Sequence, residues 1–356
     1  MMDEFRVRDR DAPISPEGII FRAYGYKHPR ESCICDVEYA DSSIYQSEDP
    51  RAPRSSTTGK YYKFYADGGL NFVKEKFPQY LIFHEPLQRK LVGIKKSQMK
   101  ELRRPDKKLN EILKLNPPDP LIEVLFDILE LIKAHSQLIP SNFGIFGSIL
   151  HDFYNLDYSD IDLIIYGRKN LAELRELLSD FYMDESFPIS NEFDKPASQT
   201  TPGHWYFTNY SVKEYLKYQR VKRIYAVIKS KKIPRTVKIE FEPVKNWTEI
   251  TEKYDTQTRI QPIGWVRAVG RILDDANGFF MEAGYPIEIE KILEGPKIDE
   301  ITKILSYVEE FRGQLSTDDR FIVEGNLEKV TSPKNEYYQI TLTYGPNYYK
   351  QMLKKY

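Results

Sequence analysis

Two aspartates in an apolar segment are the residues of this sequence best suited to chemistry. Asp160 and Asp162 lie in the stretch 159–167, which has the sequence SDIDLIIYG. Side chains two positions apart on a strand point to the same face, so we expect the two carboxylates to lie side by side. At about 5 Å they repel by roughly 3 kcal/mol if the effective dielectric constant is about 20. A divalent cation would turn this repulsion into binding. The alternative is an edge strand with a solvent-facing acidic pair.

A glycine–serine turn precedes this strand. Residues 143–146 form a short apolar run that predicts a strand, and Gly147-Ser148 follows it. A helix is expected to start near Ile149, because serine is a good N-cap residue. The free N–H groups of a helix N-terminus attract phosphate. The alternative is an ordinary helix-capping turn.

A second acidic strand is predicted downstream, at residues 236–244. Glu240 and Glu242 share one face of it, opposite Val237, Ile239 and Phe241. Between the two acidic strands, residues 211–232 have helical spacing. The stretch 213–238 holds ten Lys/Arg and the single acid Glu214, whereas residues 150–200 hold eleven Asp/Glu and four Lys/Arg. An acidic wall and a basic helix in one domain suit a phosphate that chelates a cation.

Bulk properties set the class of protein. The 356 residues are 41% hydrophobic and 29% charged, with a net charge of −1, which allows two or three globular domains. No apolar run approaches a membrane span, and the N-terminus is charged, so we expect a cytoplasmic protein without membrane contact. Cys33 and Cys35 flank Ile34 too closely for a relaxed disulfide, so we expect half-buried thiols.

Three modules are predicted along the chain. Residues 1–108 form a β-rich module with a loop at 41–60 and a basic stretch at 86–108, whose nine Lys/Arg indicate a solvated face or a nucleic-acid footprint. Residues 109–255 contain the acidic strands, with amphipathic helices at 121–135 and 171–181. Residues 256–356 predict a small β barrel or sandwich. The fold class is therefore α+β, a central mixed sheet with helices between β-rich modules.

The central pattern resembles the nucleotidyltransferase superfamily related to DNA polymerase beta. The resemblance consists of Gly147-Ser148, eleven intervening residues, and Asp160-Ile161-Asp162 in an apolar strand, and it covers roughly residues 118–245. It implies a polymerase-beta-like catalytic domain. The complete chain looks like an archaeal-type protein of this superfamily.

The resemblance also implies roles for single residues. Gly147 would let the backbone approach a triphosphate, and Ser148 would hydrogen-bond to it. Asp160 and Asp162 would hold two Mg²⁺ ions, with Mn²⁺ as a substitute. Glu240 is the predicted third carboxylate and Glu242 its rival; the superfamily usually has Asp there.

Relatives of minimal size carry an arginine soon after Gly-Ser, which this chain lacks. Arg220, Lys222 and Arg223 of the basic helix are therefore predicted to neutralise the phosphates.

The predicted function is Mg²⁺-dependent transfer of NMP from an NTP to a hydroxyl, with RNA or DNA slightly favoured as acceptor. In-line attack stabilised by two metal ions requires clustered carboxylates and no covalent nucleophile. One alternative is a catalytically inactive protein that keeps the fold and binds nucleotide or RNA. Another is a minimal nucleotidyltransferase that works with a small helical partner; the flanking modules argue against it.

Overall fold

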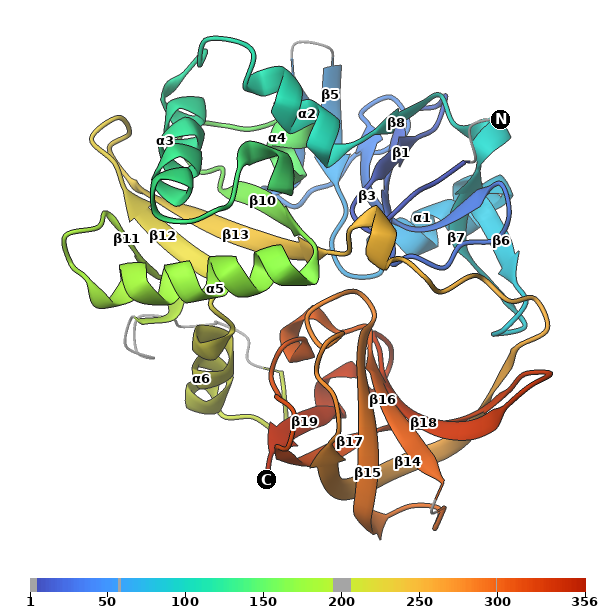
Figure 1. The fold of residues 1–356 in the computed structure, drawn as a ribbon. Coiled ribbons are helices and arrows are strands. Elements are labelled where there is room, and N and C mark those ends of the chain that lie inside the picture. The colour runs from blue at the N-terminus through green and yellow to red at the C-terminus, as the bar shows by residue number, and fades with distance from the viewer. Residues whose placement is uncertain (1–4, 57–58, 195–205, 299) are drawn as a thin grey trace. The chain divides into compact units, whose positions relative to one another are not determined.

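Two compact units make up the chain in the computed structural model, which describes residues 5–56, 59–194, 206–298 and 300–356 (Figure 1). Unit 1 comprises Met1–His84, Arg89–Ser190 and Ala226–Tyr254. Unit 2 comprises Glu85–Gln88, Asn191–Tyr225 and Asp255–Tyr356. The predicted boundary at 255 falls beside the change from unit 1 to unit 2. The predicted boundary at 108 lies inside unit 1, because the N-terminal and central modules form one unit.

The N-terminal part of unit 1 is a sheet of eight strands in the described chain. Its main order is β4-β5-β3-β2-β1-β8, and the β6–β7 hairpin joins at β3. The strands are β1 (Ala12–Ile14), β2 (Ile19–Ala23), β3 (Ser32–Asp41), β4 (Pro53–Ser56), β5 (Gly59–Lys63), β6 (Leu81–His84), β7 (Arg89–Lys95) and β8 (Glu101–Arg103). The prediction of a loop over 41–60 is wrong in part, since β4 lies inside it and pairs with β5.

The central sheet has the order β11-β12-β13-β10-β9 among the described strands. It is mixed, because β10 is parallel to β13 and antiparallel to β9. The mixed α+β class is therefore confirmed. The strands are β9 (Phe143–Ile145), β10 (Ile161–Tyr166), β11 (Ile189–Asn191), β12 (Tyr225–Lys229) and β13 (Thr236–Val244).

Helices accompany both sheets of unit 1. They are α1 (Gly68–Lys76), α2 (Pro105–Ile112), α3 (Pro120–His135), α4 (Gly147–Leu150) and α5 (Arg168–Met183). Helix α3 begins where the sequence predicts, because Asp119 accepts hydrogen bonds from the N–H groups of Leu121 and Ile122 and Pro120 takes the first helical position. Helix α5 contacts β10 and α3 (Figure 1).

One apolar cluster joins the N-terminal and central sheets. It contains Ile20 and Tyr39 of the N-terminal sheet, Ile164 of β10, and Phe146 and Phe153 on either side of α4. Burial of such side chains contributes about 1.5–3 kcal/mol each. The shared core explains why residues 1–108 do not separate from the central module.

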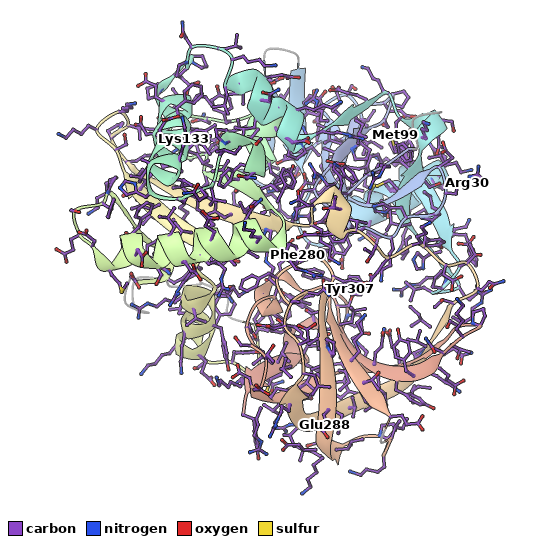
Figure 2. All side chains as sticks on the ribbon, in the orientation of Figure 1. Arg30, Met99, Lys133, Phe280, Glu288 and Tyr307 are labelled. Atoms are coloured by element: carbon purple, nitrogen blue, oxygen red, sulfur yellow. The ribbon has the colours of Figure 1, made fainter. Side chains whose placement is uncertain are left out.

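Unit 2 is built on a closed β-barrel. Strand β14 pairs with both β15 and β17, and the ring runs β14-β15-β16-β18-β17. The strands are β14 (Arg259–Ile272), β15 (Ala283–Glu294), β16 (Ile301–Ser306), β17 (Arg320–Thr331), β18 (Glu336–Leu342) and β19 (Met352–Lys355), which pairs outside the ring with β17. The prediction of a small barrel or sandwich is thus settled as a barrel. Phe280, in the connection between β14 and β15, is buried, whereas Glu288 of β15 is exposed (Figure 2).

Helix α6 (Val212–Lys222) belongs to unit 2, whereas the sequence analysis places it in the central module. The Tyr210 hydroxyl, just before it, donates to the Leu353 carbonyl of β19. The predicted helix over 211–232 is too long, because Arg223 has a left-handed φ of 54° and β12 follows. Ile, Val and Tyr after Arg223 favour a strand. No helix in the described ranges is long and apolar enough to cross a membrane.

Candidate active site

Carboxylates from two neighbouring strands line one face of the central sheet. Asp162 lies opposite Glu240 in the parallel register of β10 and β13, and Ile164 lies opposite Glu242. Asp160 immediately precedes β10 and shares the face of Asp162. The register therefore brings together the two acidic pairs that the sequence predicts on separate strands.

The glycine–serine turn packs directly on Asp162. Gly147 has a φ of +61°, and a Cβ at this position would lie 2.0 Å from Asp162 Oδ2. The Phe146 N–H donates to the Asp162 carbonyl oxygen at 2.8 Å. Position 147 therefore requires glycine for both conformation and space.

The predicted helix after this turn is only one turn long. Helix α4 ends at Leu150, and Ser148 lies inside it without a side-chain capping bond, since Phe146 is the N-cap. The expectation that Ser148 caps a helix is wrong. So short a helix offers no sustained dipole to a phosphate, although the partly exposed Ser148 hydroxyl is free to approach a ligand by rotation.

Electrostatic strain is concentrated at Asp162. Burial and, after it, the negative charges of Asp160 and Glu242 together raise the pKa of its carboxyl group to about 7. The positive charge of Lys63 opposes this shift. A cation bound between these carboxylates would relieve the repulsion.

Glu240 and Glu242 differ in environment. Glu242 is 5% exposed, and its Oε2 lies 2.7 Å from a terminal guanidinium nitrogen of Arg10. Glu240 is partly exposed and lies opposite Asp162. Glu242 is thus held as an ion pair, whereas Glu240 keeps access to solvent.

Arg10 belongs to a buried charged segment, Arg8–Asp11, that the sequence analysis did not single out. All four side chains are at most 3% exposed. Arg10 Nε also lies 3.6 Å from Asp9, and Asp9 Oδ1 accepts from the Gly25 N–H. Composition gives no signal for this burial, because a charged N-terminal stretch is normally solvated.

Carboxylate oxygens are suitable ligands for a hard divalent cation, but these carboxylates do not form a complete coordination site. No group of three or more His, Cys, Asp or Glu side chains in the described ranges is arranged to hold a metal ion. Mg²⁺ is usually bound by one or two carboxylates together with substrate phosphates and water. Asp160 and Asp162 fit that pattern, with Glu240 beside them.

The basic helix places its three predicted phosphate ligands in unit 2. Lys222 is fully buried, and its Nζ donates to Gln219 Oε1 at 2.7 Å and to the Glu310 carbonyl at 2.8 Å. Arg220 pairs with Asp194 at 2.6 Å. Arg223 is the left-handed residue that ends α6. The buried Lys222 ammonium cannot contact a phosphate, so its assignment is wrong; those of Arg220 and Arg223 stay predictions.

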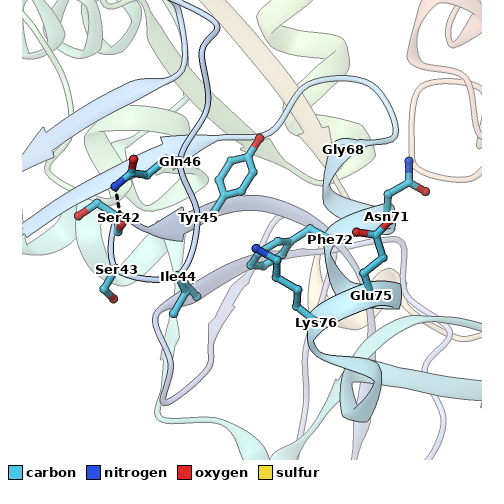
Figure 3. Close-up of a pocket in the computed structure, with 10 residues that line it drawn as sticks. All are labelled: Ser42, Ser43, Ile44, Tyr45, Gln46, Gly68, Asn71, Phe72, Glu75 and Lys76. Atoms are coloured by element: carbon cyan, nitrogen blue, oxygen red, sulfur yellow. Dashed lines mark hydrogen bonds between the residues drawn. The ribbon is translucent and has the colours of Figure 1, made fainter.

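A separate pocket of about 410 Å³ lies between the segment after β3 and helix α1 (Figure 3). Ser42, Ser43 and Tyr45 line one side, and Asn71 and Glu75 line the other. None of the predicted site residues lines it. Sequence reasoning gave no sign of this pocket, because α1 was not predicted.

One curated relative covers almost the whole chain. An uncharacterized protein of Methanocaldococcus jannaschii is 27% identical over 339 residues, which are 94% of this chain and 94% of that protein. The similarity therefore extends over both units. No protein-family model matches the chain. No solved structure matches it either.

Proposed function

We propose that this protein is a Mg²⁺-dependent nucleotidyltransferase that transfers NMP from an NTP to a hydroxyl acceptor. One observation carries the proposal: carboxylates of β10 and β13 share a face, and the Gly147 turn packs on one of them. This combination matches the polymerase-beta-like pattern of Gly-Ser followed by Asp-x-Asp. The site belongs to a polymerase-beta-like catalytic domain in this proposal.

The proposed roles follow from the environment of each residue. Asp160 and Asp162 would hold Mg²⁺, which would neutralise charge on the phosphates and on the attacking and leaving oxygens. Partly exposed Glu240 is the third carboxylate, positioned to orient the acceptor hydroxyl or take its proton. Glu242, paired with Arg10, would add negative charge near Asp162 without binding the metal ion. Gly147 and Ser148 would approach the triphosphate.

A nucleic acid is the favoured acceptor class. Five-stranded Greek-key barrels include a fold whose second and third strands bind oligonucleotides or oligosaccharides, and the ring of unit 2 has this number of strands. In unit 1, exposed lysines occur on and after β7, at Lys90, Lys95, Lys96 and Lys100. Such surfaces attract a phosphate backbone.

Replacing both aspartates tests the enzyme. With labelled NTPs, Mg²⁺ and total RNA, Asp160→Asn with Asp162→Asn should lower label incorporation more than about 100-fold, beyond the effect typical of residues that only support metal ligands. Asp157→Asn, an exposed carboxylate just upstream, should retain activity. EDTA should abolish incorporation.

The controls separate chemistry from folding. The double variant should not melt at a lower temperature than the wild type, because it removes a carboxylate repulsion. Glu240→Gln should also reduce incorporation. Full activity in the double variant would refute the carboxylate assignment. RNA or nucleotide binding without incorporation under any condition would favour the inactive binding protein.

A further inference from the structure

The N-terminal sheet forms a second wall beside the candidate active site. The Tyr61 ring of β5 packs on Phe153 with a centroid distance of 4.8 Å, and the Tyr39 ring of β3 packs on the same phenylalanine at 5.5 Å. Tyr39 also shares an apolar cluster with Phe146, which precedes Gly147, and with Ile164, two residues after Asp162. One face of β3 and β5 therefore meets the segment that carries the glycine–serine turn.

Lys63 projects from this same face. It lies two positions after Tyr61 on β5 and opposite Tyr39 in the β3–β5 register. Its Nζ lies 5.9 Å from the Tyr39 ring centroid and 5.8 Å from that of Tyr65, within the range of cation–π contacts. Lys63 is partly buried and makes no ion pair with a carboxylate of the described residues. The two rings therefore hold an ammonium that makes no direct carboxylate contact within the described ranges.

Arg54 adds a second cation to this face. It lies opposite Tyr61 in the β4–β5 register. Its Nη1 donates to the carbonyls of Arg51 and Pro53, and within the described ranges it has no carboxylate partner. Burial and the negative charge of Glu38 raise the pKa of the Tyr39 hydroxyl; the positive charge of Arg54 opposes this shift, and the negative charge of Asp162 adds to it. Arg54 and Asp162 thus both act on the Tyr39 hydroxyl.

We propose that Lys63 and Arg54 bind the phosphates of the nucleoside triphosphate whose metal ion is held by Asp160 and Asp162. The inference rests on the proposed function and names the cations that the site needs. A metal-bound triphosphate still carries negative charge, and a lysine without a carboxylate partner is a ready point charge for phosphate. These residues take the role predicted for the basic helix. They also make the N-terminal module part of the nucleotide site.

Binding measurements on the full chain test this inference. Isothermal titration calorimetry with ATP and with inorganic tripolyphosphate, each with Mg²⁺, should show at least about tenfold weaker binding for Lys63→Gln. Arg54→Gln should weaken both ligands as well, and Lys63→Arg should restore most of the affinity. Lys60→Gln is the matched control, because Lys60 is exposed, lies over the Tyr62 ring and points to the opposite face of β5.

The outcomes distinguish the inference from the proposed function. If the wild type binds ATP, the double aspartate variant does not, and Lys63→Gln and Arg54→Gln bind as the wild type does, the inference is wrong and the proposed function stands. If the wild type binds no NTP with Mg²⁺, both are wrong. Should Lys63→Gln fail to fold, Arg54→Gln decides alone. Equal weakening by Lys60→Gln would indicate a general charge effect and also overturn the assignment.

Discussion

Arg10 of unit 1 and Lys222 of unit 2 are both buried cations, at 1% and 0% exposure, but their partners differ. Arg10 faces carboxylates, with Glu242 at 2.7 Å and Asp9 at 3.6 Å. Lys222 donates to neutral oxygens, the Gln219 amide and the carbonyls of Glu309 and Glu310. A basic residue in the sequence can therefore pair with buried carboxylates or hydrogen-bond to neutral oxygens of the core.

The two cations also differ in the groups that would lose a partner if each were replaced by an apolar residue. Without Arg10, Glu242 and Asp9 would be buried carboxylates without their guanidinium partner, beside the already repulsive Asp162. Without Lys222, the Gln219 side-chain oxygen and the carbonyls of Glu309 and Glu310 would lose a donor. Isolated buried charge costs more than an unsatisfied carbonyl, so the two sites should respond unequally to mutation.

The largest effect is expected for Arg10→Met. Because it removes the guanidinium partner of two buried carboxylates, it should lower the unfolding free energy of unit 1 by about 3–5 kcal/mol. Urea unfolding of a variant whose only tryptophan is Trp247 would report on unit 1. Arg30→Met, at an exposed position, is the control and should change little. If both variants lowered the unfolding free energy equally, the prediction that Arg10 differs from a surface arginine would be wrong.

A smaller effect is expected for Lys222→Met. Loss of charge-assisted hydrogen bonds to Gln219 and to two carbonyls should lower the unfolding free energy of unit 2 by about 1–3 kcal/mol. A variant that keeps only Trp265 would report on unit 2, and exposed Lys217→Met is the control. NTP binding should be unchanged, since this ammonium is inaccessible. Weaker NTP binding in folded Lys222→Met would contradict the structural role.

The smallest effect is expected from Asp11, the acid at the end of the buried charged segment. Burial raises its pKa to about 7, so the folded chain holds a proton that the unfolded chain releases near its ordinary pKa of 3.8. The unfolding free energy should therefore fall as pH rises from about 4 to 7, by about 1 kcal/mol between pH 5 and pH 6.

Asp11→Asn mimics the protonated side chain and should lack this part of the pH dependence. Urea unfolding of the wild type and the variant at pH 5 and pH 6 gives the difference, since other groups titrate equally in both. Parallel stability curves would show that Asp11 does not bind a proton in the folded chain over this pH range.

Much of the candidate site follows from local periodicity. A two-residue repeat puts Asp160 beside Asp162 and Glu240 beside Glu242 in any regular strand. Strand β13 has the bounds that the alternation predicts, Thr236–Val244, and the need for glycine at position 147 agrees with the predicted turn. The length of α4 and the end of α6 were missed, because a single turn and one left-handed residue leave little trace in a pattern.

What the sequence by itself determined is therefore the acidic strands, the glycine turn and the α+β class, because strand alternation and turn chemistry act over a few residues. The tertiary structure decided which strands pair, so that Asp162 meets Glu240. It also decided which basic residues are near the carboxylates: Arg10 and Lys63 from the N-terminal module, with Lys222 buried in unit 2. Charged side chains look alike in a sequence, and only long-range packing determines whether each meets water, a carboxylate or a backbone carbonyl.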